Sequence, residues 1–512
     1  MKLSKISFAA ALVCVAASSQ AAMVAGSAQQ IQLDDANNHG RVIYISGASA
    51  IQKGFDSIVA GLFTPGTTNF YASGSNSTNG TKADYVAVVG QLATTIGSWT
   101  AGQNVIIQYR TLGGSGMGVF PLVRNTTAAN TPAGQTTGIT FANVSTATCT
   151  PATGTNALTN PHVCTGTVTQ VPDAGVADVD PSYGAFDSAY NTPGETAQAN
   201  LTTTEIGLLG TPKHLYGLAF GVAVTNNVPV SVNFNKSLYS AILAGNVGTW
   251  DQVDPSLAAD DIVICRRTPG SGTQVIANQA FGSYPCTTAH PNSAPADRAS
   301  NPYWVLNADG TQTINVGANT GAAIVIENDT SGDLKNCLAA TQGGTTGTNF
   351  SFTTHDRDGV KAVTVNFGSA RKAIGLLSLD SLNGGPSTTG AWSFRSLGGA
   401  GQITQSGNNT PSVTPGSTGV LPTFTDIIAG NYDLISQETM LIPTRTTGEK
   451  ATVLGQIATY AQSATILAGV PALQFVAGVF PSASLVGTAP AGNTLRTSLV
   501  GGDFCSPLQR NN

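Results

Sequence analysis

The feature that most restricts the fold is a recurring order of elements: a short strand pattern, a turn of glycine and hydroxyl residues, and an apolar or helical continuation. It occurs at residues 41–45 followed by SGAS, at residues 105–109 followed by GGSGMG, and at residues 261–265 followed by RRTPGSGT, in which the first arginine is Arg266. Strands that alternate with helices in this way are typical of an α/β architecture with mainly parallel sheets. We therefore expect an α/β fold with the glycine turns at the carboxyl ends of strands.

The length of 512 residues favours two domains. Only 10% of the residues are charged and the net charge is −5, which disfavours a nucleic-acid surface, because such surfaces need clustered Lys and Arg. Four long segments are rich in Thr, Gly, Asn, Ser and Pro, and we expect them to form surface loops or small β additions. These segments are residues 125–169, 286–321, 340–353 and 383–422.

Residues 1–22 have the pattern of a signal peptide. Lys2 and Lys5 precede an apolar run, and small residues precede a cleavage site near Ala21 or Ala22. Cys14 follows a valine where a lipoprotein signal requires a small residue, so we expect no lipid anchor. No later run of about 18 apolar residues predicts a transmembrane helix, so we expect no membrane insertion. The expected destination is the periplasm or the cell exterior.

Six cysteines remain after residue 22, and an even number in an exported chain indicates disulfide bonds. Closeness in the sequence favours Cys149–Cys164 and Cys265–Cys286, which leaves Cys337–Cys505. No pair has the CxxC spacing of a zinc or redox site. We therefore expect structural disulfides, with no metal and no cofactor.

Two adjacent arginines stand before a glycine turn in a chain that is poor in charge. Arginine presents a planar fork of donors, glycines let backbone N–H groups approach a ligand, and Ser271 and Thr273 add hydroxyl groups. A helix that starts at this sheet edge also attracts anions. The pattern indicates an oxyanion site, with an ordinary turn beside a surface ion pair as the alternative. Arg266 fits a supporting charge and an outer ion pair equally well.

A run of carboxylates, DAGVAD at residues 173–178 with Asp180 behind it, would by charge alone oppose an anion site. A carboxylate accepts a hydrogen bond from an anion that carries a proton, as phosphate does near neutral pH, whereas it repels fully ionised sulfate. The alternatives for this run are calcium ligands and a solvated loop.

The motifs SGAS, GGSGMG, DAGVAD and RRTPGSGT occur in the order found in phosphate-binding proteins of ABC transporters, and the chain resembles that family. The most specific match is the loop in which Arg267 precedes Gly-Ser-Gly-Thr by three residues. Supporting matches lie at residues 241–255, 372–381 and 430–444, so that the resemblance extends from about residue 42 to about residue 463.

The resemblance implies a two-lobed periplasmic-binding-protein fold with mixed, mainly parallel sheets and long polar insertions. Lobe I would comprise residues 23–224 and about 430–512, lobe II about 225–429, and phosphate would lie in the cleft between them. The implied phosphate-binding residues are Ser49, Ala50, Ser115, Asp178, Arg267, Ser271, Gly272 and Thr273.

The chain departs from the family pattern in two loops. Where the family often has a threonine, this chain reads Ser49-Ala50-Ile51, so either Ser49 takes that role or one hydroxyl is missing. In the second loop the additional Met117 leaves Gly114 or Ser115 opposite the ligand serine of the family.

The leading hypothesis for function is non-catalytic capture of hydrogen phosphate by an exported protein, with an ABC transporter component as the implied partner. The alternative is a secreted structural or matrix protein on the same fold with weak or no phosphate binding, which the low charge and the polar insertions favour. A phosphate-ester hydrolase is disfavoured, and we expect no enzyme, because the histidines form no HExxH motif and flank no nucleophile motif. These histidines are His39, His162, His214, His290 and His355.

Overall fold

The structure is a computed structural model of the chain. It describes residues 23, 26–49, 52–74, 83–124, 138–151, 161–181, 201–282, 296, 301–344, 347–355, 361–382, 391–406, 410–463, 466, 475–476, 496–499 and 508–511. The proposed signal peptide, Ala50, Cys286 and Cys505 lie outside the described residues.

The described helices and strands alternate only in parts of the chain, because several runs of strands have no helix between them. The helices are α1 (Ala28–Asn38), α2 (Gln52–Ala60), α3 (Phe120–Val123), α4 (Thr203–Leu208), α5 (Lys236–Leu243), α6 (Trp250–Val253), α7 (Gly272–Gly282), α8 (Ser331–Gln342), α9 (Phe424–Ala429) and α10 (Gly448–Tyr460), with short 3-10 helices η3 (Ser115–Gly118) and η9 (Leu379–Leu382). The first twelve strands are β1 (Val42–Gly47), β2 (Asn69–Ser73), β3 (Tyr85–Gln91), β4 (Asn104–Arg110), β5 (Ile139–Ala142), β6 (Cys149–Pro151), β7 (Pro161–Cys164), β8 (Thr167–Gln170), β9 (Ala174–Ala177), β10 (Lys213–Thr225), β11 (Val263–Arg267) and β12 (Trp304–Leu306). The remaining strands are β13 (Gln312–Asn315), β14 (Ile324–Asn328), β15 (Ser351–His355), β16 (Ala362–Asn366), β17 (Ala373–Ser378), β18 (Trp392–Arg395), β19 (Gln402–Ser406), β20 (Thr410–Val413), β21 (Ile435–Leu441), β22 (Phe475–Val476), β23 (Arg496–Leu499) and β24 (Leu508–Asn511).

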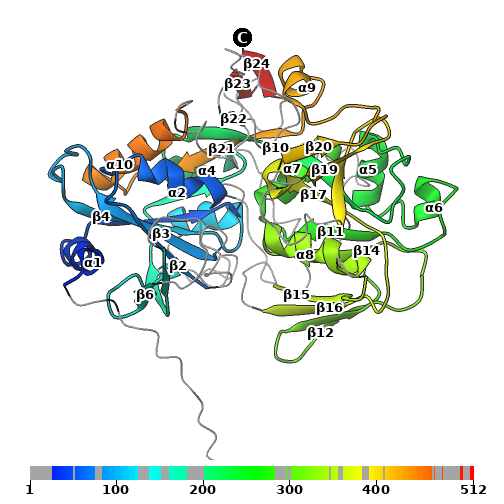
Figure 1. Cartoon of the computed structure of the whole chain (residues 1–512), viewed down its shortest axis with the longest axis horizontal. Coiled ribbons are helices and arrows are strands. Elements are labelled where there is room, and N and C mark those ends of the chain that lie inside the picture. Colours follow the sequence, from blue (N-terminus) through cyan, green and yellow to red (C-terminus); the bar gives the residue numbers. More distant parts are fainter. Residues whose placement is uncertain are drawn as a thin grey trace, which may run out of the picture.

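One large mixed sheet connects the two halves of the molecule. Its strand order is β14-β11-β17-β10-β21-β9-β1-β4-β3-β2-β7-β6. The long strand β10 crosses between the halves, because its first part pairs with β21 up to Ala219 and its second part pairs with β17 from Phe220 onward. Figure 1 shows the blue and cyan elements of the first half beside the green and yellow elements of the second half, with β10 and β21 running between them.

The mixed α/β fold is confirmed, and parallel pairing is confined to parts of it. β1 is parallel to β4 and β9, β11 is parallel to β14 and β17, and β2–β7 and β13–β16 are parallel pairs. The other described pairs are antiparallel and outnumber these, so the sheets are not mainly parallel. One reason is that short connections, as in β18–β19–β20, allow only antiparallel neighbours, whereas parallel neighbours need a crossover of a dozen or more residues.

Alternation along the central strands fills two cores. Ile43 and Ile45 of β1 belong to the main core with Phe55 of α2, whereas Val42 packs on the opposite face with Leu33 of α1. Helices therefore cover both faces of this part of the sheet, as buried parallel strands require. No helix among the described residues is both long and apolar enough to span a membrane.

The polar segments contain the small β additions that we expected. Residues 125–169 include β5, β6 and β7, and residues 383–422 include β18, β19 and β20. Strands β12, β13, β15 and β16 form a separate small sheet, which Figure 1 shows at the lower edge of the second half.

The disulfide prediction is confirmed for one pair and wrong for the others. Cys149 and Cys164 are bonded, and they are directly paired residues of β6 and β7. Cys265 is bonded to Cys337 rather than to Cys286, so Cys337 is not paired with Cys505. The physical reason is that α8, which carries Cys337, packs on β11, which carries Cys265. Contact in the folded chain, rather than separation along it, decides the partner.

Candidate functional site

The third glycine turn joins a buried strand to a buried helix. All residues of β11 are buried, and Arg267 is its last residue. Gly270 has a φ of 87°, a backbone conformation that glycine adopts without strain, and this turns the chain so that α7 starts at Gly272. The sequence therefore places Arg267 at the carboxyl end of a central strand, directly beside the first turn of a helix.

Arg267 is almost completely buried, at 1% exposure, and its guanidinium donates hydrogen bonds to uncharged oxygen atoms. Nε donates to the carbonyl of Asn328 at 3.1 Å, and Nη2 donates to the carbonyl of Asp329. Nη1 donates to Oγ of Ser331 at 3.0 Å and to Oγ of Ser49 at 3.4 Å. Two of the acceptors are therefore hydroxyl groups, which can reorient toward a ligand.

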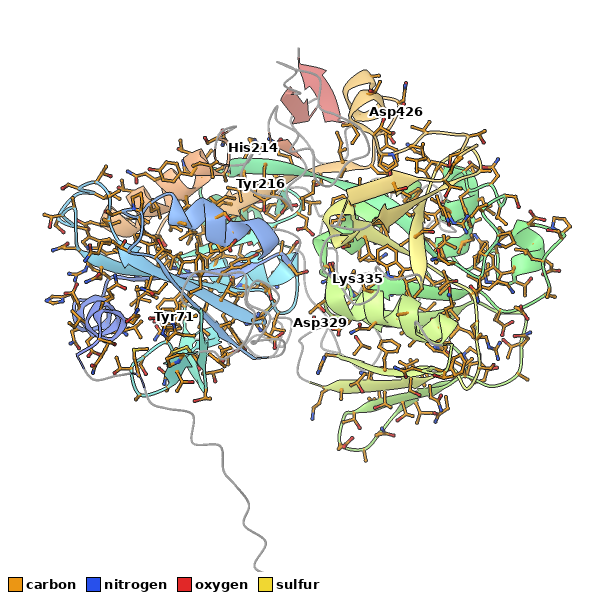
Figure 2. All side chains as sticks on the ribbon, viewed as in Figure 1. Tyr71, His214, Tyr216, Asp329, Lys335 and Asp426 are labelled. Atoms are coloured by element: carbon orange, nitrogen blue, oxygen red, sulfur yellow. A yellow bond between two sulfur atoms is a disulfide. The ribbon has the colours of Figure 1, made fainter. Side chains whose placement is uncertain are left out.

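The charge of Arg267 is balanced by carboxylates that surround it. Burial lowers the pKa of its guanidinium, and the negative charges of Asp329, Asp178 and Asp333 oppose that shift. Figure 2 shows Asp329 where the two halves of the molecule meet. The site thus combines a desolvated cation with several nearby acids.

Ser115 connects the second glycine turn to the arginine turn. Its side chain is fully buried, and its Oγ accepts hydrogen bonds from the backbone N–H of Asp178 at 3.0 Å and of Gly272 at 3.2 Å. The N–H of Gly116 donates to the carbonyl of Gly270 at 2.8 Å. The sequence leaves Gly114 or Ser115 as the counterpart of the family's ligand serine. Ser115 is the one whose hydroxyl contacts both Asp178 and the start of α7. Gly114 lies there as well, but it offers no side chain.

Gly272 is required by this close approach. A β-carbon at Gly272 would lie 2.4 Å from Oγ of Ser115 and 2.5 Å from Cβ of Asp178. Distances below 3.0 Å are not tolerated between such atoms. The backbone of α7 can therefore contact the loops of the other half only because residue 272 has no side chain.

Asp178 follows β9 and is 2% exposed. Thr273 donates to its Oδ2 at 3.5 Å, whereas its Oδ1 has no hydrogen-bond partner among the described residues. Burial raises the pKa of the Asp178 carboxyl group, and hydrogen bonds from Glu438, Ser115 and Thr273 and the charge of Arg267 partly oppose this shift. Within the same described part of the chain, Oγ of Ser271 is also buried without a partner.

The structure brings together most of the residues that the resemblance implies. Ser49, Ser115, Asp178, Arg267, Gly272 and Thr273 are linked by the contacts above, and Ser271 lies in the same turn. Ala50 lies outside the described residues. Arg266 points away, because side chains alternate along β11, and it forms a buried ion pair with Glu327. It is therefore an ion-pair residue, although not on an outer face.

Sequence reasoning missed Glu438 and the turn after β14. Asn328, Asp329 and Ser331 form this turn, which precedes α8 and contacts Arg267. A strand pattern at residues 323–328, followed by Thr330 as a capping residue with Asp333 three positions on, was a detectable signal. Glu438 is a single carboxylate within a strand pattern, and no motif marks it.

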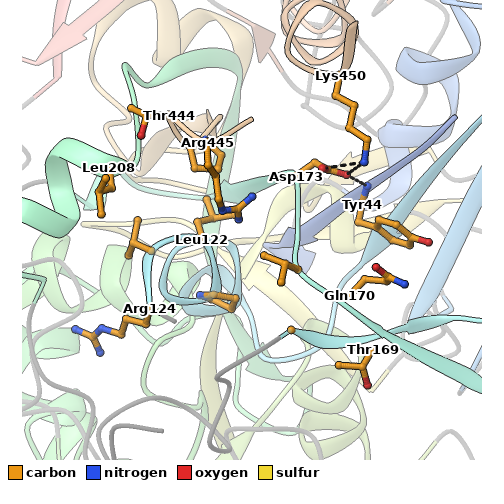
Figure 3. A pocket seen from close by; sticks show the side chains of 15 residues that line it. Tyr44, Leu122, Arg124, Thr169, Gln170, Asp173, Leu208, Thr444, Arg445 and Lys450 are labelled. Carbon is orange, nitrogen blue, oxygen red and sulfur yellow. Dashed lines mark hydrogen bonds and ion pairs between the residues drawn. The ribbon is translucent and has the colours of Figure 1, made fainter. Parts of the chain in front are cut away.

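A cavity lies in the first half, and none of the residues of the predicted site lines it. Its volume is about 650 Å³, and it is lined by Tyr44, Arg124, Asp173, Arg445, Lys450 and neighbouring residues. Lys450 forms an ion pair with Asp173 at 3.0 Å, and Arg445 donates to the carbonyl of Pro172 at 2.6 Å, as Figure 3 shows for the first pair. The charged groups at its wall thus already have protein partners.

No protein-family model matches the sequence, and no curated protein matches it. Solved structures that are similar to this chain include the human phosphate binding apolipoprotein, with 13% identity, coverage of 86% of this chain and 91% of the other, and a TM-score of 0.37. The high affinity periplasmic phosphate-binding protein PfluDING has 13% identity, the same coverage of both chains and a TM-score of 0.36. An ABC-type phosphate transport receptor from Vibrio cholerae has 13% identity, coverage of 56% and 74%, and a TM-score of 0.25.

Proposed function

We propose that the chain captures hydrogen phosphate between its two halves, without catalysing a reaction on it. The observation that carries this proposal is a pair of buried atoms without hydrogen-bond partners among the described residues, Oγ of Ser271 and Oδ1 of Asp178, close to the buried guanidinium of Arg267. Buried polar atoms in native proteins nearly always have partners, so unpaired ones beside a cation indicate the place of a ligand.

Hydrogen phosphate matches this set of groups. Its oxygens accept from Arg267, from hydroxyl groups such as Ser271, and from backbone N–H groups at the start of α7. Its own proton donates to Asp178, which sulfate cannot do near neutral pH. The site therefore discriminates between the two anions through one hydrogen bond, because a carboxylate that faces sulfate has only repulsion and an unpaired acceptor.

The domain organisation is part of the same proposal. Lobe I consists of residues 23–224 and about 430–512, and lobe II of about 225–429, with β10 and β21 as the connecting strands. This division is supported by the change of partner along β10 at Ala219 and Phe220. Ser49, Ser115 and Asp178 then belong to lobe I, and Arg267 and the start of α7 to lobe II. We further propose export of the chain and delivery of phosphate to an ABC transporter.

Isothermal titration calorimetry of the purified protein with phosphate and with sulfate tests the proposal. We expect saturable binding of phosphate and at least about tenfold weaker binding of sulfate, since one buried hydrogen bond to a charged group contributes roughly 1.5–3 kcal/mol. No binding of either anion, together with no effect of phosphate on thermal stability, would reject capture and favour the alternative of a secreted structural protein.

A further inference from the structure

The strand pairing places a second carboxyl group next to Asp178. β21 is antiparallel to β9, with Thr439 opposite Ala177 and Met440 opposite Val176. The register continued by one residue brings Glu438 opposite Asp178, with both side chains on the same face of the sheet. Ser436 strengthens this junction by donating from its Oγ to the carbonyl of Asp178. Glu438 is fully buried.

Two buried carboxyl groups at opposite positions of paired strands cannot both be ionised without a large cost, because each charge loses its hydration and repels the other. They form a hydrogen bond only when one of them carries a proton. With a proton on Glu438, its carboxyl group is the donor and Asp178 is the acceptor, and Glu438 is the first among the groups that counteract the burial-raised pKa of Asp178. A carboxylate has about four acceptor positions, so Asp178 has room for Glu438, Thr273 and a ligand proton.

The other charged and titratable groups around the pair do not remove this proton. Arg267 of β11 acts on Asp178 as a cation, with Asp329 and Asp333 behind it. Tyr109 of β4 faces both carboxyl groups, and burial together with their charges raises its pKa well above the ordinary value. The hydroxyl of Tyr109 donates to the carbonyl of Ala48, so this tyrosine stays protonated and supplies no proton to the pair.

We propose that Glu438 determines the upper pH limit of phosphate capture, because it holds one proton on the Glu438–Asp178 pair and the site loses its anion affinity when that proton leaves. This inference rests on the proposed function. With the proton in place, the pair carries one negative charge and Asp178 accepts the proton of the ligand. Without it, two negative charges face the dianion, and the single guanidinium of Arg267 no longer balances them.

The test is calorimetric titration with inorganic phosphate from about pH 6 to about pH 10. Hydrogen phosphate becomes the main phosphate species near neutral pH and remains the main species up to the end of this range. For the wild-type protein we expect the affinity to fall at least about tenfold on the alkaline side. Glu438→Gln keeps the shape of the side chain and cannot ionise, so we expect its affinity to stay level over the same alkaline range. Glu449→Gln, at an exposed carboxylate on α10, is the matched control and should follow the wild type.

Identical pH profiles for the wild type and Glu438→Gln would overturn the proposal. If Glu438→Gln does not fold, infrared spectroscopy of the ligand-free wild-type protein tests the proposal instead. We expect the carbonyl band of a protonated carboxyl group at neutral pH. This band should disappear over the pH range in which phosphate affinity falls. Absence of this band at neutral pH would overturn the shared proton. A protein that shows the band but binds no phosphate at any pH would instead overturn the proposed function.

Discussion

Nη1 of Arg267 lies 3.4 Å from Oγ of Ser49, so that a side chain at the end of β11 donates a hydrogen bond to the turn after β1. The two residues are 218 positions apart in the sequence and belong to different halves of the molecule. The same guanidinium holds the turn before α8 through Ser331 and two backbone carbonyls. Arg267 is thus the point at which three turns that follow strands are joined.

Replacement of Arg267 by lysine should strongly reduce phosphate binding. Lysine retains the charge but has three donors on one nitrogen, which cannot reproduce the fork that contacts Asn328, Asp329 and Ser331. We expect Arg267→Lys to weaken binding by about tenfold to a hundredfold, which corresponds to roughly 1.5–3 kcal/mol for lost hydrogen bonds of a charged group. Calorimetric titration measures this change directly.

The neighbouring arginine provides the matched control for this prediction. Arg266 pairs with Glu327 on the opposite face of β11, and Arg266→Lys retains a cation for that pair. We expect Arg266→Lys to bind phosphate within about twofold of the wild type, because its ion pair does not contact the candidate site. Equal losses in the two variants would show that the assignment of Arg267 to the site is incorrect.

Part of this site could be predicted from the sequence, because the relevant information is local. The three strand–turn–helix patterns place Ser49 and Ser115 after strands and Arg267 at the end of one, and such turns meet at one edge of a sheet. The partner of Cys265 could not be predicted in this way, because it depends on how α8 packs on β11. Glu438 was missed for a similar reason, since its place beside Asp178 follows from the register of β9 and β21.

Replacement of Gly272 by alanine should disrupt the contact between the two halves. The added methyl group would lie 2.4 Å from Oγ of Ser115 and 2.5 Å from Cβ of Asp178, so one of the loops has to move. We expect Gly272→Ala to lower phosphate affinity by at least about tenfold, since ligand groups on both sides shift. Gly455→Ala in α10 is the control: nothing lies within 4 Å of its β-carbon, and alanine there should stabilise the helix by about 1 kcal/mol. Unchanged affinity in Gly272→Ala would contradict the close approach.

Loss of the Cys265–Cys337 disulfide should destabilise the fold more than loss of Cys149–Cys164. The two bonds span 72 and 15 residues, and a longer loop gains more conformational entropy in the unfolded chain when its bond is removed. The chain-entropy relation gives about 4 kcal/mol for the first bond and about 3 kcal/mol for the second. Urea unfolding of the two double Cys→Ala variants measures the difference, and peptide mapping without reduction checks the pairing. A peptide that links Cys265 to Cys286 would refute the assignment.

Asp56 on α2 should make the stability of the protein depend on pH in the mildly acidic range. Burial raises the pKa of its carboxyl group from 3.8 to about 6, with only partial opposition from hydrogen bonds around Ser57. Because the folded state binds the proton more tightly than the unfolded state, Asp56 favours folding below pH 3.8 and this contribution is lost as the pH rises to about 6. Above that range the ionised, buried carboxylate costs about 3 kcal/mol relative to the acidic limit.

Asp56→Asn removes this titration, because an amide has no proton to lose. The free energy of unfolding of the variant, relative to wild type, should therefore increase by about 2.4 kcal/mol between about pH 4 and about pH 7. Urea unfolding at several pH values within this range provides the measurement. Asp309→Asn is the control, since hydrogen bonds from Thr311 lower the pKa of the exposed Asp309 carboxyl group and the dependence should have the opposite sign. If the difference in unfolding free energy between Asp56→Asn and wild type stays constant with pH, burial does not raise the pKa of the Asp56 carboxyl group.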